Sequence, residues 1–151
     1  LYAARFSGGR PRRAAAVSPM PASPSGARIL VVDDNVVNQK VALIQLRKLG
    51  YAADTAFSGR EAVAAAGTFD YDLVLMDCEM PDMDGFEATR EIRRREEGRR
   101  RTPILAMTAS IQSSDRNRCL EAGMDGYVEK PIRPEELRGV LARWLGPAER
   151  V

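Results

Sequence analysis

Four apolar segments of the chain end on side chains that can hold a cation or a phosphate group. The segments and the residues that follow them are 28–32 with Asp33 and Asp34, 72–76 with Asp77, 103–107 with Thr108, and 126–129 with Lys130. Short apolar segments between helical patterns are typical of buried parallel strands, and an open α/β sheet binds its ligand beyond the carboxyl ends of such strands. We therefore expect three carboxylates, a hydroxyl and an ammonium to meet in one crevice.

The chemistry that such a crevice favours is transfer of a phosphoryl group to a carboxylate. A carboxylate accepts this group only when the charge of the incoming dianion is neutralised, so oxygen ligands should hold a hard cation such as Mg²⁺ nearby. We predict that Asp33, Asp34, Asp77 and the backbone carbonyl of Glu79 are those ligands. Without a cation, three close carboxylates would repel one another and raise their own pKa values. The alternative is that residues 33–35 only cap a helix, but the matching acid on another strand favours the metal site.

Asp77 is the predicted phosphoryl acceptor because it ends a strand, whereas Asp82 and Asp84 belong to the turn pattern that follows it. Thr108 is predicted to donate its hydroxyl to a phosphoryl oxygen. Lys130 is predicted to pair with Asp77 and then, once Asp77 is loaded, with the phosphate. The alternatives for these residues are a turn aspartate, an ordinary β-branched strand end and a solvated surface lysine.

Tyr127 lies three residues before Lys130 on the same expected strand. Its ordinary interpretation is a half-buried aromatic ring with a solvated hydroxyl. In a functional interpretation, Thr108 moves toward the phosphate and leaves space into which the Tyr127 ring rotates. The surface formed by the last two helices and the strand 126–129 would then change shape.

The elements that must position these residues alternate between strand and helix patterns from Arg28 onward. Apolar residues such as Val37, Val41 and Ile44 indicate a helix after the first strand, and a similar helical pattern follows each later strand. The remaining expected strands cover 52–57, 72–77, 103–108 and 126–129, and the last expected helix covers 134–145. Five such units predict an α/β fold, with a doubly wound five-stranded parallel sheet and helices on both faces.

The same residues resemble the receiver domain of two-component response regulators. The resemblance is carried by the segments 33–35, 76–85, 106–109 and 130–132, in matching order and spacing over residues 28–146. It implies the strand order 2-1-3-4-5, a cis peptide bond between Lys130 and Pro131, and a partner that donates phosphate from a histidine. That partner would be a histidine kinase or a histidine phosphotransfer domain. Further details, including residues 35–40, most resemble receivers of hybrid sensor histidine kinases.

Composition divides the chain into a basic tail and a slightly acidic domain. Residues 1–26 carry four arginines and no acid, and they read as a disordered linker ahead of a domain over 27–146 and a short tail over 147–151. The remainder holds 19 basic and 21 acidic residues, which gives a net charge of −2 and argues against direct nucleic-acid binding. The two cysteines have no disulfide or zinc spacing, which indicates a cytoplasmic setting. The sequence shows no long apolar segment, although a parent protein could be membrane-anchored.

Several alternatives remain open at this point. The start at Leu1 and the linker-like tail favour a fragment of a hybrid kinase over a stand-alone regulator, and a weak dimer through the surface of the last two helices is also expected. The chain has no histidine, so it cannot be the phosphoryl donor, although it would promote its own phosphorylation and dephosphorylation. A magnesium-dependent phosphoaspartyl hydrolase is disfavoured because Asn35 replaces its acid. A flavin- or nucleotide-binding module is disfavoured because Asp33 and Asp34 would repel phosphate without a metal.

Three further residue types have competing interpretations. Cys78 beside the acceptor suggests redox chemistry, but a buried small hydrophobe is the commoner role. The arginines at 93–95 and 99–101 suggest a nucleic-acid surface, but the interleaved glutamates favour a solvated helix end and loop. Trp144 is expected to pack in the core first and to contact a partner second.

Overall fold

The computed structural model describes residues 27–98, 100–109 and 113–145, so the expected linker over 1–26 and the tail over 147–151 lie outside the described residues. Five parallel strands form one sheet in the order β3-β2-β4-β5-β6, which is the predicted order 2-1-3-4-5. The strands are β2 (Arg28–Val32), β3 (Ala52–Ala56), β4 (Leu73–Asp77), β5 (Ile104–Thr108) and β6 (Gly126–Glu129).

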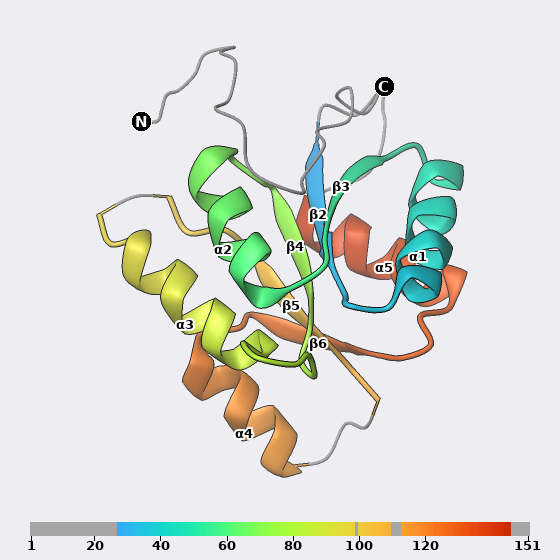
Figure 1. Ribbon diagram of the computed structural model, residues 1–151. Helices are drawn as coiled ribbons and strands as arrows, with labels where there is room; N and C mark the ends of the chain where they lie inside the picture. Colours follow the sequence, from blue (N-terminus) through green and yellow to red (C-terminus); the bar gives the residue numbers. More distant parts are fainter. Residues whose placement is uncertain (1–26, 99, 110–112, 146–151) are drawn as a thin grey trace.

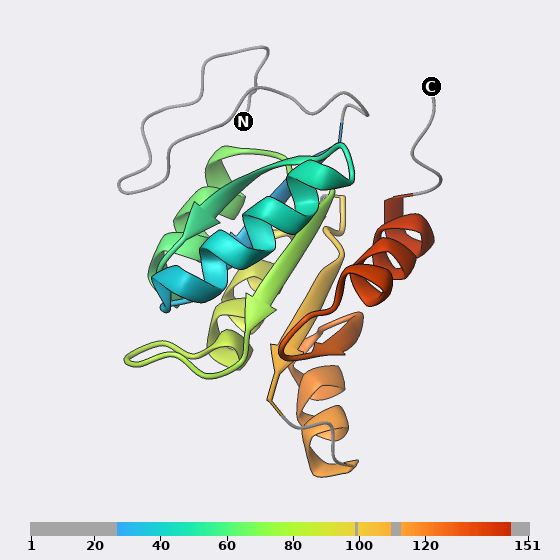
Figure 2. The same ribbon diagram turned by 90° about the vertical axis from the view of Figure 1, so that its right-hand side faces the viewer.

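Five helices cover the two faces of this sheet. They are α1 (Val36–Lys48), α2 (Gly59–Thr68), α3 (Gly85–Arg95), α4 (Ser113–Ala122) and α5 (Pro134–Leu145). Figure 1 shows α1 and α5 on one side of the sheet and α2 and α3 on the other, and Figure 2 shows the same layers from the side of α1. The prediction of a doubly wound α/β fold is therefore confirmed.

The alternation of side chains along the strands divides the core into two layers. Leu30, Val74 and Ala106 point toward α2, α3 and α4, whereas Val31 and Leu105 point toward α1 and α5. Every residue of β4 is buried, as expected for a central strand that is covered on both faces. Trp144 packs against the second layer, which confirms its predicted core role.

Helix α1 leaves several of its apolar residues exposed. Val37 and Ile44 are 67% and 51% exposed, and Val41 is also exposed. The buried positions are Gln39 and, with it, Ala42 and Leu46, which share one face at helical spacing. The sequence predicted the helix correctly but not its orientation, and an apolar surface therefore remains uncovered on α1 in the described structure.

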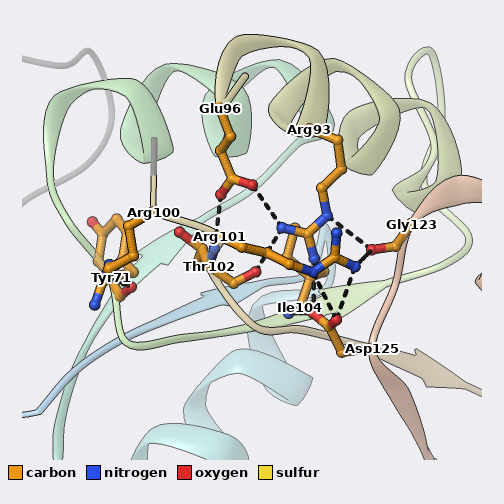
Figure 3. Close-up of polar contacts among 9 residues, drawn as sticks. All are labelled: Tyr71, Arg93, Glu96, Arg100, Arg101, Thr102, Ile104, Gly123 and Asp125. Atoms are coloured by element: carbon orange, nitrogen blue, oxygen red, sulfur yellow. Dashed lines mark hydrogen bonds and ion pairs between the residues drawn. The ribbon is translucent and has the colours of Figure 1, made fainter. Parts of the chain in front are cut away.

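The arginines that follow the middle of α3 do not all form a solvated helix end. Arg94 and Arg95 pair with Glu91 on the surface, as predicted. Arg93 is largely buried, and Figure 3 shows its guanidinium held by partners on three separate segments. Those partners are Glu96 at 2.7 Å, the Thr102 carbonyl at 2.7 Å, the Gly123 carbonyl at 2.8 Å and Asp125 at 2.7 Å. For Arg93 the predicted solvated position is therefore wrong, and this side chain joins α3 to the turns before β5 and β6.

Within the described ranges, no helix combines the length and apolar character needed to cross a bilayer.

Gly85 at the start of α3 provides a test of how tightly the loop after β4 is packed. A Cβ atom at this position would lie 2.2 Å from the Asp77 carbonyl oxygen, which is backbone and cannot move freely. We expect Gly85→Ala to lower the free energy of unfolding by about 1–3 kcal/mol. Gly67→Ala is the matched control, because a Cβ there meets nothing within 4 Å. Because this substitution replaces a glycine inside helix α2, it should raise the free energy of unfolding by about 0.5–1 kcal/mol. Urea denaturation measures both changes, and a Gly85 variant as stable as the parent would contradict the packing.

Candidate functional site

Parallel strands bring the predicted acids together at one edge of the sheet. Asp33 follows β2 and Asp77 ends β4, and these strands are hydrogen-bonded neighbours with Val32 opposite Met76. Asp33, Asp34 and Asp77 each place a carboxylate oxygen so that the three atoms lie within 4.8 Å of one another. Asp33 and Asp77 are buried, whereas Asp34 is exposed. The three predicted acids are therefore clustered, with two of them buried and one exposed.

Lys130 supplies the positive charge in this cluster. Its ammonium lies 3.0 Å from Asp77 Oδ1 and 3.4 Å from Asp33 Oδ2. Burial alone would lower the pKa of Lys130, but the hydrogen bond to Asp77 and the charges of Asp77 and Asp33 raise it above its ordinary value. The Lys130–Pro131 bond is cis, as the family resemblance implied. The predicted pairing of Lys130 with Asp77 is therefore present.

The carboxyl of Asp77 has a perturbed pKa. Burial raises its pKa to about 6, although the hydrogen bond from Lys130 and that from the backbone N–H of Glu79 favour the ionised form. The Glu79 N–H donates to Asp77 Oδ1 over 3.1 Å. Glu79 itself is exposed, and the role of its carbonyl as a ligand stays a prediction.

Thr108 and Tyr127 lie on the two strands beyond Asp77. Asp77 of β4 pairs with Met107 of β5, so Thr108 lies one position beyond that pair. On the other side of β5, Ala106 pairs with Tyr127 of β6. Because paired residues of parallel strands point to the same face and side chains alternate along a strand, Thr108 and Tyr127 share the face covered by α4. The Tyr127 ring is 39% exposed and lies beneath the guanidinium of Arg116. The two residues lie on the same face of the sheet, and their coupled motion stays a prediction.

The turn after Asp77 has the structural roles predicted for it. Asp84 caps α3 by accepting from the Glu87 N–H at 2.9 Å, and the Glu87 side chain accepts in return from the Asp84 N–H. Asp82 adopts a φ of 74° and pairs with Arg60 at 3.0 Å on the surface. Cys78 is buried, and burial raises the pKa of its thiol, which agrees with the small-hydrophobe interpretation.

The geometry separates the cap of the first helix from the carboxylate of Asp33. Asn35 alone is the cap of α1, accepting from the Asn38 N–H at 3.0 Å. Asp33 instead accepts from the Asn35 N–H at 2.8 Å and faces Lys130. Its carboxylate therefore belongs to the cluster.

The donor set fits a hard divalent cation. Three carboxylates are opposed by the single ammonium of Lys130 among the described residues of the cluster, so the site carries an excess of negative charge. Carboxylate oxygens are the ligands that Mg²⁺ prefers, and such an ion commonly uses one or two of them together with water. Asp33, Asp34 and Asp77 are the residues that would hold it.

Two features near this site were not predicted. The first is the apolar surface of α1, which begins at Val36, two residues after Asp34. It borders a groove of about 320 Å³ lined by residues of α1 and of the segment after β6, including Val41, Pro131 and Ile132. The second is the buried amide of Gln39, which shares the inner face of α1 with Ala42 and Leu46. Its polar side chain at helical spacing from two apolar residues was the only indication in the sequence.

Comparison with known proteins agrees with this geometry. The model of the response regulator receiver domain matches residues 29–142. The chain belongs to this family. It is therefore a receiver domain of a two-component phosphorelay, and the alternatives of a phosphoaspartyl hydrolase and a flavin module are wrong.

The curated relatives are much longer proteins. The receiver domain is 44% identical to a part of the hybrid signal transduction protein dokA of Dictyostelium discoideum, covering 78% of this chain and 7% of that protein. It is 42% identical to a part of the probable histidine kinase 3 of rice, with 82% and 14% covered. The chain thus spans only a small share of the length of these relatives.

Solved receiver domains have the same fold. One is the receiver of a Pseudomonas aeruginosa sensor histidine kinase, which was crystallised with magnesium coordinated in its active-site cleft. Its TM-score is 0.73 and its sequence identity is 48%, with 80% of this chain and 98% of that chain covered. Another is a yeast response regulator receiver solved with a histidine phosphotransfer protein, at a TM-score of 0.75 and 30% identity, with 78% and 88% covered.

The raised pKa of Asp77 predicts a gain in stability when its charge is removed. The group titrates near its ordinary value of 3.8 when unfolded and at about 6 when folded, so stability falls as the pH rises through this window. In metal-free buffer at pH 7, Asp77→Asn should be about 1–3 kcal/mol more stable than the parent, and the difference should vanish near pH 4. Asp82→Asn, at an exposed position, is the control and should change stability by less than about 0.5 kcal/mol. A gain that persists unchanged at pH 4 would contradict the electrostatic cause.

Proposed function

We propose that this receiver domain accepts a phosphoryl group from a phosphohistidine onto Asp77, with Mg²⁺ held by Asp33, Asp34, Asp77 and the Glu79 carbonyl. The observation that carries this proposal is the clustering of three carboxylates with the ammonium of Lys130. The Pseudomonas relative with magnesium in its cleft supports the choice of ion.

The transfer forms one bond and breaks one. A carboxylate oxygen of Asp77 attacks phosphorus, while the bond between phosphorus and the donor imidazole nitrogen breaks and its electron pair stays on that nitrogen. Lys130, 3.0 Å from Asp77 before transfer, pairs with a phosphoryl oxygen afterwards, and Thr108 donates its hydroxyl to another. When bound, Mg²⁺ supplies the positive charge that offsets the phosphoryl dianion.

The apolar surface of α1 provides the docking site for the phosphohistidine donor. Val36, Val37, Val41 and Ile44 are all about half exposed or more, and contiguous exposed apolar residues are typical of interaction sites. The donor histidine must come within bonding distance of Asp77, so its domain has to rest on a surface beside the crevice. The proposed partner is a histidine kinase or a histidine phosphotransfer domain, and the yeast receiver solved with a histidine phosphotransfer protein supports this class of partner. An apolar surface on that partner would complement the exposed apolar residues of α1.

The output surface is the one formed by α4, β6 and α5. Thr108 and Tyr127 share the face of the sheet beneath α4, so movement of the hydroxyl toward phosphate changes the space available to the ring. A weak dimer through this surface is a further part of the proposal.

We assign the chain to a hybrid sensor histidine kinase, because the relatives described above are hybrid or histidine kinases of which it covers only a part. The alternative is a stand-alone regulator. A cytoplasmic setting is proposed because both cysteines are free thiols.

Labelling with a small phosphodonor tests the proposed acceptor. With acetyl phosphate and Mg²⁺, the parent should gain one acid-stable but base-labile phosphate by intact mass, and Asp77→Asn should gain none, because an amide is a poor nucleophile. Asp82→Asn is the control and should be labelled like the parent. Full labelling of the Asp77 variant would contradict the assignment.

A pair of exposed apolar residues tests the docking surface. Val37 on α1 and Leu120 on α4 are each 67% exposed, so a charge at either position leaves the core intact. We expect Val37→Glu to slow transfer from a phosphorylated histidine phosphotransfer domain about ten-fold or more, with labelling by acetyl phosphate unchanged. Leu120→Glu should leave both rates unchanged. Equal transfer rates for the two variants would place the donor elsewhere.

Beryllofluoride, which stands for the phosphoryl group, tests the switch. In the parent, amide shifts on binding should spread from the ends of β4 and β5 into α4 and β6. In Thr108→Ala, beryllofluoride should still bind through Asp77 and Lys130, but the shifts should stay near the site, because the hydroxyl that draws the signal is missing. An equal spread in both proteins would leave Thr108 as a phosphate ligand and Tyr127 as packing.

A further inference from the structure

Gln39 is a buried polar side chain that takes no part in the phosphoryl transfer proposed above. It lies on the inner face of α1 with Ala42 and Leu46 and is 2% exposed. Placing an amide in such a position costs free energy unless its hydrogen bonds are made. An apolar side chain would be the ordinary choice for packing at this position.

Both hydrogens of the Gln39 amide are used at the carboxyl ends of two strands. Its Nε2 donates to the Asp33 carbonyl at 2.9 Å and to the Ala56 carbonyl at 2.7 Å. Ala56 ends β3, and the Asp33 N–H donates to the same Ala56 carbonyl at 3.1 Å. The main-chain pairing of β2 with β3 stops there, so the side chain of Gln39 replaces the next backbone donor.

We infer that Gln39 is a positioning residue for the cation site, which fixes the backbone of Asp33 and so presents the carboxylates of Asp33 and Asp34 to Mg²⁺. The N–H of Asp33 is held by Ala56 and its carbonyl by Gln39, so neither peptide group beside its Cα is free to rotate. The carboxylate of Asp33 is in turn held by the Asn35 N–H and Lys130. Groups behind metal ligands commonly tune affinity in this way.

The inference rests on the proposed function, because it assumes that the acid pair binds Mg²⁺. Calorimetric titration with MgCl₂ separates the two claims. The parent should bind the ion, and Asp34→Ala, which loses an anionic ligand, should bind it far more weakly. If Asp34→Ala bound Mg²⁺ as the parent does, the proposed metal site itself would be wrong.

Gln39→Met then tests the positioning role, because methionine keeps the length of the side chain without its donors. We expect its Kd for Mg²⁺ to rise about ten-fold or more. Gln39→Asn keeps the amide but shortens the side chain by one methylene, so its Kd for Mg²⁺ should rise less. This second variant keeps the test informative if Gln39→Met folds poorly. Hydrogen exchange at the Asp33 amide should be faster in both.

Tyr71→Phe is the control for a purely structural effect. It removes a buried hydrogen bond of 2.6 Å to Asp54, away from the acid cluster, and should lower the thermal midpoint without changing the Kd for Mg²⁺. If both Gln39 variants kept the Kd of the parent while Asp34→Ala lost affinity, the inference would be overturned and the amide would be only structural.

Discussion

The crowding of negative charge at one edge of the sheet is the constraint on which the rest of the structure depends. Two carboxylates are buried and a third is exposed beside them, and Lys130 is the cation that contacts the buried pair in the described structure. Burial raises the pKa of Asp77 to about 6, so the protein groups around Asp77 do not fully stabilise its ionised form. Excess negative charge makes the binding of a cation to this site favourable. The site also holds the acceptor oxygen where a phosphoryl group can reach it.

Rigid surroundings keep these charges close together. β4 is buried on both faces, Gly85 allows the backbone after Asp77 to pack without a side chain, and Gln39 holds the end of β2 against β3. On the far side of the sheet from α1, Arg93 joins α3 to the turns before β5 and β6. The turn between α4 and β6, the two elements that are expected to move, is thus attached to a fixed frame. Thr108 lies at the opposite end of the neighbouring strand β5.

Much of this arrangement follows from local sequence patterns. Strand ends are marked by the change from apolar residues to Asp33, Asp77, Thr108 and Lys130, and the last helix covers the predicted residues 134–145. Contacts between distant residues were not predictable in the same way. Arg93 meets Asp125 across 32 positions, and nothing in a charged run distinguishes that arginine from its exposed neighbours. The helical pattern predicted α1 but not which of its faces is buried, because several of its apolar residues lie on the outer surface while Gln39 occupies the core.

The most direct test of the central claim is chemical trapping of the phosphorylated residue. After loading with acetyl phosphate and Mg²⁺, borohydride reduces an acyl phosphate to an alcohol, which marks the acceptor permanently. Peptide mass mapping should find the homoserine form of Asp77 and leave Asp33 and Asp34 unchanged. Reduction at either of those two residues, or no reduced residue in a chain whose intact mass shows a phosphate, would contradict the account.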